Sequence, residues 1–379
     1  MKWKETVFDD LARLNRGFDL PSHQIEDGPY PVVASTSIAA FHKAFKVEGP
    51  GVVTGRSGSL GKVQYLPGRF WPLNTSLYVK DFKGNNEKFV AYFLETMRLE
   101  NFNSGAGVPT LNQNHLHKLS VSIPPLFFQR KIAGILTVYD DLIDTNKRRI
   151  VLLEKMGDEI YHEWFVRMRF PDHQNGRIIR GMPEGWERKR FGDFCMLKRG
   201  YDLPNDLVEE GPYPVVASTS VKTFHKHYKV EPPVITTGRS GSLGDVLMTH
   251  TRAWPLNTVL YVRKFFGNSP FLVYYTLKNM GLEKFNSGAG IPTLNRNHVN
   301  GIPMVVPDKN LQQQFDRIVD PIHKQAENFR QENINLTKTR DLLLPRLISG
   351  KLSVADLDIQ FPPSMCEGAK GQDRGDASG

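Results

Sequence analysis

The eight residues TGRSGSLG stand at positions 54–61 and recur unchanged at positions 237–244, which places the two copies 183 residues apart. Three more stretches repeat at the same separation: GPYPVVASTS from Gly28 and Gly211, WPLNT from Trp71 and Trp254, and FNSGAG from Phe102 and Phe285. Residues 17–125 align with residues 200–308 without a gap. The repeat decides the fold before any local pattern does, because each copy must be one structural unit.

Each copy predicts a compact domain of mixed α and β structure. Short apolar, β-branched runs bounded by Gly, Pro and Asn indicate strands at residues 30–35, 51–54 and 76–79. Residues 87–102 carry apolar side chains at roughly helical spacing before Asn103-Ser104-Gly105 ends the pattern. We therefore expect two similar α+β domains of about a hundred residues each.

A long amphipathic helix is predicted after each domain. From Ile132 to Trp164 the seam residues recur every four and three positions, as in a coiled coil, and the same positions from Phe315 to Leu347 repeat the seam more faintly. A single helix of this kind usually covers its own domain. Here about 33 helical residues would span about 50 Å, more than such a domain can cover. We expect the two helices to pack on each other.

A pseudo-twofold axis relating the two copies would set these helices antiparallel, with one domain at each end. Asn146 and Asn333 are polar members of the two seams. Since a buried asparagine fixes register at some cost in stability, we predict that these two residues pair and set the register of the helix pair. Pro321 predicts a kink or a late start in the second helix.

The predicted boundaries follow from these patterns. They are residues 1–125 for the first domain, 126–169 for the central long helix, 170–185 for a connecting loop, 186–308 for the second domain, 309–354 for the C-terminal long helix and 355–379 for a disordered tail.

Composition narrows the partners of this chain. Its 379 residues carry a formal net charge of +9, which favours a polyanionic partner without establishing one. We find neither a run of about 18 apolar residues nor a signal peptide, so we expect a cytoplasmic protein. Cys195 and Cys366 lack the spacing of a zinc site or a disulfide framework.

The glycine-rich stretch does not fit an enzyme's phosphate-binding loop. Gly55 is one residue too far from Gly61-Lys62, no Ser or Thr follows that lysine, and the second copy has Asp245 in its place. The histidine pair at residues 115 and 117, and the pair at 225 and 227, each lose one member in the other copy, which argues against a metal site. Without a nucleophile motif either, we expect a chain with no catalytic residues, no metal and no cofactor of its own.

Polar residues on the glycine-rich loops are the candidate DNA contacts, because Arg and Asn read base edges while Ser, Thr and Lys hold phosphates. The candidates are Ser35, Thr36, Ser37, His42, Lys43, Arg56, Ser57, Ser59, Arg69 and Asn103 in the first copy, and Ser218, Thr219, Ser220, His225, Lys226, Arg239, Ser240, Ser242, Arg252 and Asn286 in the second. Turn formation is the alternative explanation for Gly, Ser and Asn. It does not explain Arg56 and Arg239, because a turn does not require arginine.

The order of these segments resembles that of the DNA-specificity subunit of type I restriction-modification enzymes. The resemblance rests on SIPPLFFQRKIAGILTVYDDLID at residues 122–144, GMPEGWERKRFGDF at 181–194, VVPDKNLQQQFDRIVDPI at 305–322 and LLLPRLISGKLSV at 342–354. It covers nearly the whole chain up to Val354, and its specificity lies in the order and duplication of the segments. One departure is Phe127-Phe128, which replaces a more usual acidic, glutamine-containing helix start.

The resemblance implies a division of labour. Each domain would be a target-recognition domain that reads one half of a split site on double-stranded DNA, and the helices would act as spacer and docking surface for two methyltransferase subunits. Those partners would bind S-adenosylmethionine and methylate adenine, and motor-endonuclease subunits would complete the complex. Because the two domains carry like loops, we predict like half-sites in inverted orientation, hence a nearly palindromic site. The two copies differ at Lys62 against Asp245 and at Ala39-Ala40 against Lys222-Thr223, and these differences would make recognition of one half-site less strict.

Two other functions stay open at this point. A pseudo-dimeric DNA-binding regulator or scaffold would have the same repeat but no methyltransferase partners. A duplicated ligand-binding enzyme would need a cofactor site, for which the sequence offers no motif.

Overall fold

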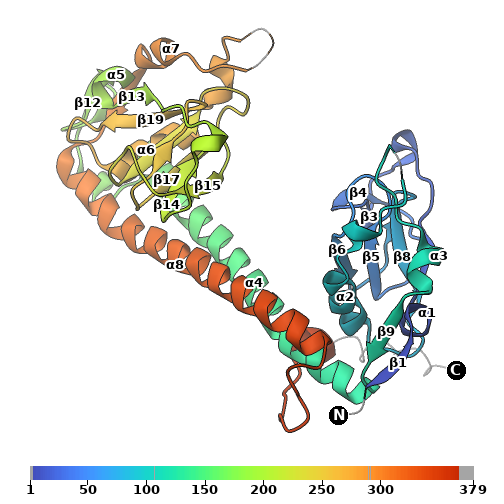
Figure 1. Cartoon of the computed structure of the whole chain (residues 1–379). Coiled ribbons are helices and arrows are strands. Elements are labelled where there is room, and N and C mark those ends of the chain that lie inside the picture. Colours follow the sequence, from blue (N-terminus) through green and yellow to red (C-terminus); the bar gives the residue numbers. More distant parts are fainter. Residues whose placement is uncertain (1–2, 106, 289, 291, 367–379) are drawn as a thin grey trace, which may run out of the picture. The chain divides into compact units, whose positions relative to one another are not determined.

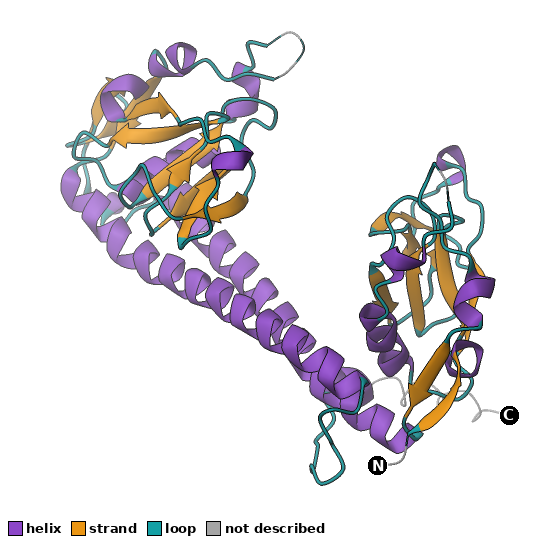
Figure 2. Ribbon diagram, in the orientation of Figure 1, coloured by secondary structure: helices purple, strands orange, loops and turns teal. Residues whose placement is uncertain are grey.

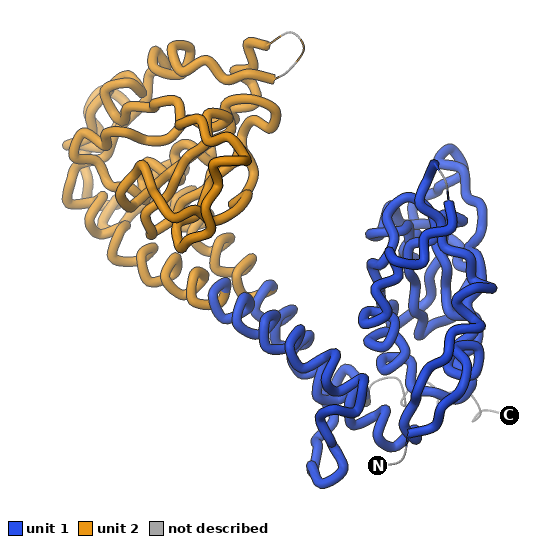
Figure 3. Tube along the Cα trace, viewed as in Figure 1, with its two compact units in different colours: residues 1–147, 330–379 blue, residues 148–329 orange. Residues whose placement is uncertain are grey.

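The computed structural model describes residues 3–105, 107–288, 290 and 292–366. The chain divides into two compact units, Met1–Lys147 with Arg330–Gly379, and Arg148–Phe329 (Figure 3). The boundary runs through the long helices α4 (Leu126–Tyr161) and α8 (Lys309–Ile348), so each helix contributes one segment to each unit.

The globular part of unit 1 is built from three antiparallel or mixed sheets. Their strand orders are β2-β8-β5-β6, β4-β3-β7 and β1-β9. The elements are β1 (Lys4–Val7), α1 (Phe8–Leu11), β2 (Arg13–Arg16), β3 (Tyr30–Val33), β4 (Ile38–His42), β5 (Gly51–Gly55), β6 (Val63–Leu66), β7 (Trp71–Pro72), β8 (Ser76–Asp81), α2 (Glu87–Thr96), α3 (Gln113–His117) and β9 (Ser120–Ile123) (Figure 1).

The globular part of unit 2 repeats this topology. Its strand orders are β13-β19-β16-β17, β15-β14-β18 and β12-β20. The elements are β12 (Glu187–Arg190), α5 (Phe191–Phe194), β13 (Met196–Arg199), β14 (Tyr213–Val216), β15 (Val221–His225), β16 (Val234–Gly238), β17 (Val246–Thr249), β18 (Trp254–Pro255), β19 (Val259–Lys264), α6 (Pro270–Asn279), α7 (Arg296–Asn300) and β20 (Pro303–Val306) (Figure 2). The predicted duplication of an α+β domain is confirmed element by element.

Each globular part shares its apolar core with the helix segments of its own unit. In unit 1, Phe89 and Phe93 of α2 lie in one buried cluster with Ile132 and Leu136 of α4 and Leu347 of α8. In unit 2, Tyr275 of α6 lies in one cluster with Phe315 of α8 and with Tyr161 at the end of α4. Burial of one helix face therefore stabilises both the domain and the helix pair.

The helix segments run antiparallel in each unit. In unit 1, Asp140 contacts Arg340 and the Ile143 carbonyl accepts a bond from Asn333, so positions rise along α4 as they fall along α8. In unit 2, Arg149 contacts Phe329 and Tyr161 contacts Phe315, so the direction is the same. Every predicted seam position on α4 and α8 is buried or half-buried. The predicted seam and antiparallel pairing are confirmed, whereas the pseudo-twofold relation between the units stays a prediction.

Several predicted details differ from the structure. α8 runs from Lys309 through Pro321, so the predicted late start is wrong; one missing N–H does not break a helix whose apolar face is buried on both sides of the proline. α8 ends at Ile348, before the expected Val354, because Gly350 takes a left-handed conformation with φ of 74°. α4 ends at Tyr161, and one π-helical turn, His162–Val166, follows it.

The connecting segment contains a two-stranded hairpin, β10 (Ile178–Ile179) and β11 (Met182–Pro183). Arg180 and Gly181 both have positive φ, as a tight two-residue turn requires, so this part is more than a loop.

The predicted disordered tail is wrong for residues 355–366. Lys131 Nζ of α4 donates to the carbonyls of Ala355 and Leu357 at 3.2 and 2.6 Å, and the short helix α9 (Pro363–Cys366) follows. Ser364 Oγ donates to Asp141 Oδ2 at 2.6 Å, so this stretch lies against α4. Residues 367–379 lie outside the described part of the chain.

Candidate DNA interface

Three loops of unit 1 join in one cluster, which we call loop cluster 1: the β3–β4 turn (residues 34–37), the loop after β5 (56–62) and residues 103–111. Ser35 Oγ donates to the carbonyls of Ser57 and Thr75 at 3.0 and 2.8 Å. The Gly58 N–H donates to the Pro109 carbonyl at 2.9 Å, and the Leu111 N–H donates to the Arg56 carbonyl at 2.8 Å. The stretch that opens the sequence repeat is thus held from both sides.

Loop cluster 2, at residues 217–220, 239–245 and 286–294, repeats these bonds. Ser218 Oγ donates to the carbonyls of Ser240 and Thr258 at 3.2 and 3.1 Å. The Gly241 N–H donates to Pro292 at 2.9 Å, and the Leu294 N–H donates to Arg239 at 2.8 Å. Ala106, Ala289 and Ile291 lie outside the described residues.

The glycines of the repeated stretch are explained by local geometry. A Cβ at Gly55 would lie 2.0 Å from the Ser59 carbonyl oxygen, and one at Gly238 would lie 1.8 Å from that of Ser242. Gly58 has φ of 82°, where side chains are strained. The glycines therefore shape the loop, and its capacity to bind depends on the other residues.

Arg56 and Arg239 are placed alike in the two clusters. Each is half-buried, and each donates from Nη1 to a backbone carbonyl at 3.3 Å, that of Asn74 or that of Asn257. A guanidinium has five N–H donors in a planar fork, so one such bond orients the side chain and leaves donors for a ligand.

The other predicted residues of the clusters divide into bonded and exposed ones. Asn103 Oδ1 accepts from the N–H groups of Gly105 and Thr110, both at 2.9 Å, and Asn286 Oδ1 accepts the two equivalent bonds in unit 2. These side-chain oxygens stabilise turns. The remaining hydroxyls are half-buried at Thr36, Ser57 and Ser240, and exposed at Ser37, Ser59, Thr219, Ser220 and Ser242.

His42, Lys43 and Arg69 find their partners outside loop cluster 1. His42 is buried, accepts from the Glu26 N–H at 3.1 Å and packs edge-on against Trp71. Lys43 pairs with Glu26 at 2.7 Å, and Arg69 pairs with Glu48 at 2.8 Å.

Unit 2 repeats these contacts. His225 accepts from Glu209 N–H, and Lys226 pairs with Glu209 at 3.3 Å. Arg252 pairs with Glu231 at 3.0 Å. All six residues therefore have a partner within their own unit, and their contact with DNA stays a prediction.

Sequence reasoning missed a basic cleft of about 370 Å³ in unit 1, between β2, β8 and α3. Its lining includes Arg13, Lys80, Lys83 and His117 together with Asp81, which pairs with Lys83 at 3.0 Å. Burial lowers the pKa of His117, whose Nε2 accepts from the Leu14 N–H at 3.0 Å, and the cations would suit a phosphate. The sequence repeat does not point to this cleft, because the second copy has Met196, Phe266 and Asn300 in place of Arg13, Lys83 and His117.

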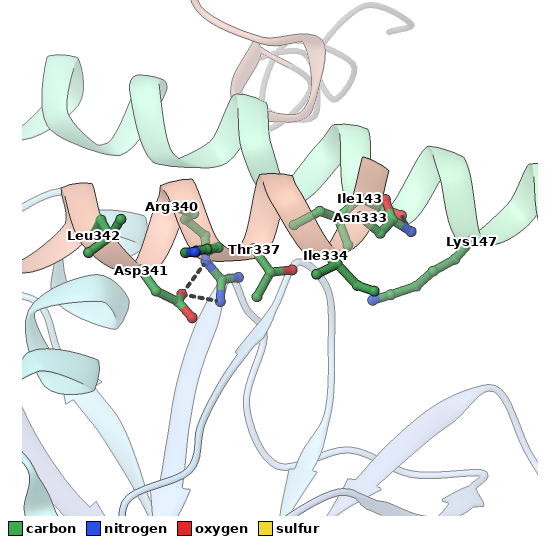
Figure 4. Close-up of a pocket in the computed structure, with 9 residues that line it drawn as sticks. Ile143, Lys147, Asn333, Ile334, Thr337, Arg340, Asp341 and Leu342 are labelled. Atoms are coloured by element: carbon green, nitrogen blue, oxygen red, sulfur yellow. Dashed lines mark hydrogen bonds and ion pairs between the residues drawn. The ribbon is translucent and has the colours of Figure 1, made fainter. Parts of the chain in front are cut away.

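The helix pair of unit 1 carries a shallow groove of about 780 Å³, lined by α4 and α8 (Figure 4). Arg340 lines this groove, and its guanidinium forms ion pairs with Asp140 at 2.6 Å and with Asp341 at 2.8 Å. Asn146 is fully buried and donates to Glu332 at 3.1 Å, while Asn333 donates to the Ile143 carbonyl at 3.3 Å. Each amide therefore binds the opposite helix, and their role in register stays a prediction.

Among the described residues, no three His, Cys, Asp or Glu side chains lie close enough together to hold a metal ion. None of the helices in the described ranges is long and apolar enough to cross a membrane.

The family model of the type I restriction modification DNA specificity domain matches residues 1–155 and 183–338. The chain belongs to this family. The family match confirms the resemblance read from the sequence, together with the predicted class of function: a DNA sequence-specificity subunit, which is not itself an enzyme.

Relatives extend the match over most of the chain. The MjaIX specificity subunit of Methanocaldococcus jannaschii is 24% identical over 287 residues, which are 68% of this chain and 66% of that protein, just under two thirds. A proposed type I specificity subunit of Mycoplasma pneumoniae is 23% identical over 334 residues, or 83% of this chain and 87% of that protein. The S-subunit crystal structure from M. genitalium superposes with a TM-score of 0.61 at 19% identity, covering 91% of this chain and 96% of that one, which supports the fold.

Proposed function

We propose that this chain reads a bipartite, nearly palindromic DNA site, with loop cluster 1 and loop cluster 2 each contacting one half-site. The observation that carries the proposal is the likeness of the two clusters: the same residues make the same bonds, including the arginine contacts at 3.3 Å, although Lys62 stands against Asp245. Two like readers recognise like sequences, and a twofold relation between them would invert one half-site. The net charge of +9 favours association with the DNA backbone.

Arg56 and Arg239 are the proposed base readers. A planar guanidinium that is held in place by one bond can present two parallel N–H donors to guanine. The exposed hydroxyls beside it, Ser37 and Ser59 in unit 1, would hold phosphates or sugars.

We also propose that two methyltransferase subunits dock on the long helices. Val151, Leu152 and Met156 of α4 are 62%, 61% and 52% exposed, and Ile334 and Leu342 of α8 are 55% and 63% exposed. Large apolar side chains exposed together on one element mark a partner surface. In this proposal S-adenosylmethionine binds to those partners and not to this chain, motor-endonuclease subunits complete the complex, and the complex works in the cytoplasm.

Mapping methylated adenines tests the DNA part. Cells that express the chain with its modification subunits should methylate two like, inverted half-sites around an unspecific spacer, and two unrelated half-sites would refute the palindrome. Arg56→Ala and Arg239→Ala should each cost about 1–3 kcal/mol of binding and relax one half-site only. Arg69→Ala is the matched control, because its guanidinium is engaged by Glu48.

Co-purification tests the partner part. The full chain should recover two methyltransferase subunits per copy. A chain that binds DNA sequence-specifically yet recovers none would be a pseudo-dimeric regulator or scaffold instead.

A further inference from the structure

The duplication creates a problem of self-recognition. α4 and α8 descend from one repeat, so α4 could pair with the α4 of a second copy, and α8 with a second α8, in the antiparallel geometry that α4 and α8 adopt within one chain. Whether these alternatives form depends on the residues that meet across the seam.

One contact between α4 and α8 is made by different residues in the two units, and both partners of the contact have changed. In unit 1, Asn146 of α4 donates to Glu332 of α8 at 3.1 Å. The residues 183 positions away occupy the equivalent places in unit 2, where the guanidinium of Arg149 lies 5.3 Å from the ring centre of Phe329. Both contacts are favourable, one as a hydrogen bond and the other as a cation–π contact.

A second contact differs in the same reciprocal way. In unit 1, Arg340 of α8 pairs with Asp140 of α4 at 2.6 Å, and Tyr92 of α2 donates to the same carboxylate. The place of Arg340 is taken in unit 2 by Gly157, where a Cβ would lie 1.8 Å from the hydroxyl of Tyr275.

That hydroxyl lies 2.8 Å from Nε2 of His323, which stands in unit 2 where Asp140 stands in unit 1. Arginine therefore fits the place beside Asp140 in unit 1, and glycine fits the equivalent place beside Tyr275 in unit 2.

Pairing with a second copy would break all of these contacts. In an α4–α4 pair, Asn146 would meet Arg149, and Asp140 would face Gly157, which leaves a partly buried carboxylate without its cation. In an α8–α8 pair, Phe329 would meet Glu332, and Arg340 would enter the space that Tyr275 fills.

We propose that these contacts are a pairing code through which α4 selects α8 of its own chain and rejects the helices of a second copy. Chance divergence would alter single positions, whereas here both members of each contact differ and match each other. The code is independent of DNA binding.

An exchange of residues between the two helices tests the code. The variant Arg149→Glu, Gly157→Arg, Glu332→Arg, Arg340→Gly has the amino-acid composition of the original chain. It transfers every favourable contact to the α4–α4 and α8–α8 pairs. Light scattering coupled to size-exclusion chromatography should give the mass of one chain for the original protein and of two chains for the variant.

If the variant with four substitutions aggregates, a variant that exchanges only the two exposed residues still tests the proposal. Arg149 and Glu332 are exposed, so Arg149→Glu with Glu332→Arg should fold and should dimerise at least tenfold more tightly than the original chain. Lys155→Gln with Gln331→Lys moves a charge between the helices at exposed positions and should change nothing. A dimeric original chain would overturn the proposal, as would a folded double exchange that dimerises no more tightly than this control.

Discussion

Replacing one buried glutamine should loosen the attachment of α8 to its domain. Gln312 is 2% exposed, and its Oε1 accepts from the Ser269 N–H at 2.8 Å. Its Nε2 donates to the Pro307 carbonyl at 2.8 Å and to Asn268 Oδ1 at 3.3 Å. Gln312→Ala removes these bonds at once.

The expected loss follows from the groups left behind. A buried donor or acceptor without a partner costs about 1–3 kcal/mol, and here the Ser269 N–H and the Pro307 carbonyl both lose theirs. Ser269 also caps α6, since its Oγ accepts from the Leu272 N–H at 3.1 Å, so a displaced Ser269 loosens the helix start. We expect unit 2 to lose about 3 kcal/mol of unfolding free energy.

Urea unfolding of the full chain measures this loss. With a slope of about 2 kcal/mol per M, the transition of unit 2 should move down by about 1.5 M. Hydrogen exchange in α6 should accelerate in parallel, because the helix start opens more often. Gln313→Ala is the matched control: the same residue type at the next position, but exposed, with an expected change within about 0.5 kcal/mol. If the two variants unfold at the same urea concentration, the reasoning about Gln312 is wrong.

Three shorter predictions concern other sites. Gly157→Ala should destabilise unit 2 by about 1–3 kcal/mol, although alanine usually favours a helix, because the added methyl group would meet the Tyr275 hydroxyl. In a double-mutant cycle, Tyr275→Phe should restore part of the lost stability, whereas a stabilised Gly157→Ala chain would contradict this contact. Cys195 is fully buried and burial raises the pKa of its thiol, so in a Cys366→Ser chain a disulfide reagent should label it only after unfolding, and rapid native labelling would disprove its burial. Asn146→Leu should raise the urea midpoint, since Asn146 Oδ1 is buried with no partner among the described residues; a lower midpoint would show that the bond to Glu332 outweighs this cost.

The architecture could be predicted because its signals are local or repeated. A constant separation of 183 residues needs no knowledge of contacts, and the seam from Ile132 to Trp164 follows from helical periodicity alone. Pro321 misled the prediction because burial of the surrounding seam outweighs one lost hydrogen bond. The docking of residues 355–366 had no signal, since Lys131 binds backbone carbonyls there, and any residue supplies those.

The candidate site was predicted at the level of loops but not of atoms. Ser35 and Ser37 are the same residue type two positions apart, yet the first is buried on two carbonyls and the second is exposed. Only tertiary structure separates them. Gln129 and Gln312 were overlooked although they recur at the repeat separation, and the bonds of Gln129 to Asn86, Asn85 and Pro124 match those of Gln312. The sequence did offer a signal for these residues: the starts of α4 and α8 otherwise differ, yet both keep a glutamine at this position.

Comparison of the two copies separates residues that recognise an outside ligand from residues that recognise the other copy. At the loop clusters, Arg56 and Arg239 with their neighbours are identical, as two readers of one sequence must be. At the helix seam the two copies differ, with Gly157 in α4 and Arg340 at the equivalent position of α8. Such a difference is expected of two surfaces that must fit each other but must not fit a second copy of themselves. Glycines and buried serines would be retained for the loop fold alone, so they do not decide between these explanations. The arginines do, because the turn does not need them: if Arg56→Ala left both half-sites equally specific, loop identity would reflect folding, and the palindromic site would lose its main support.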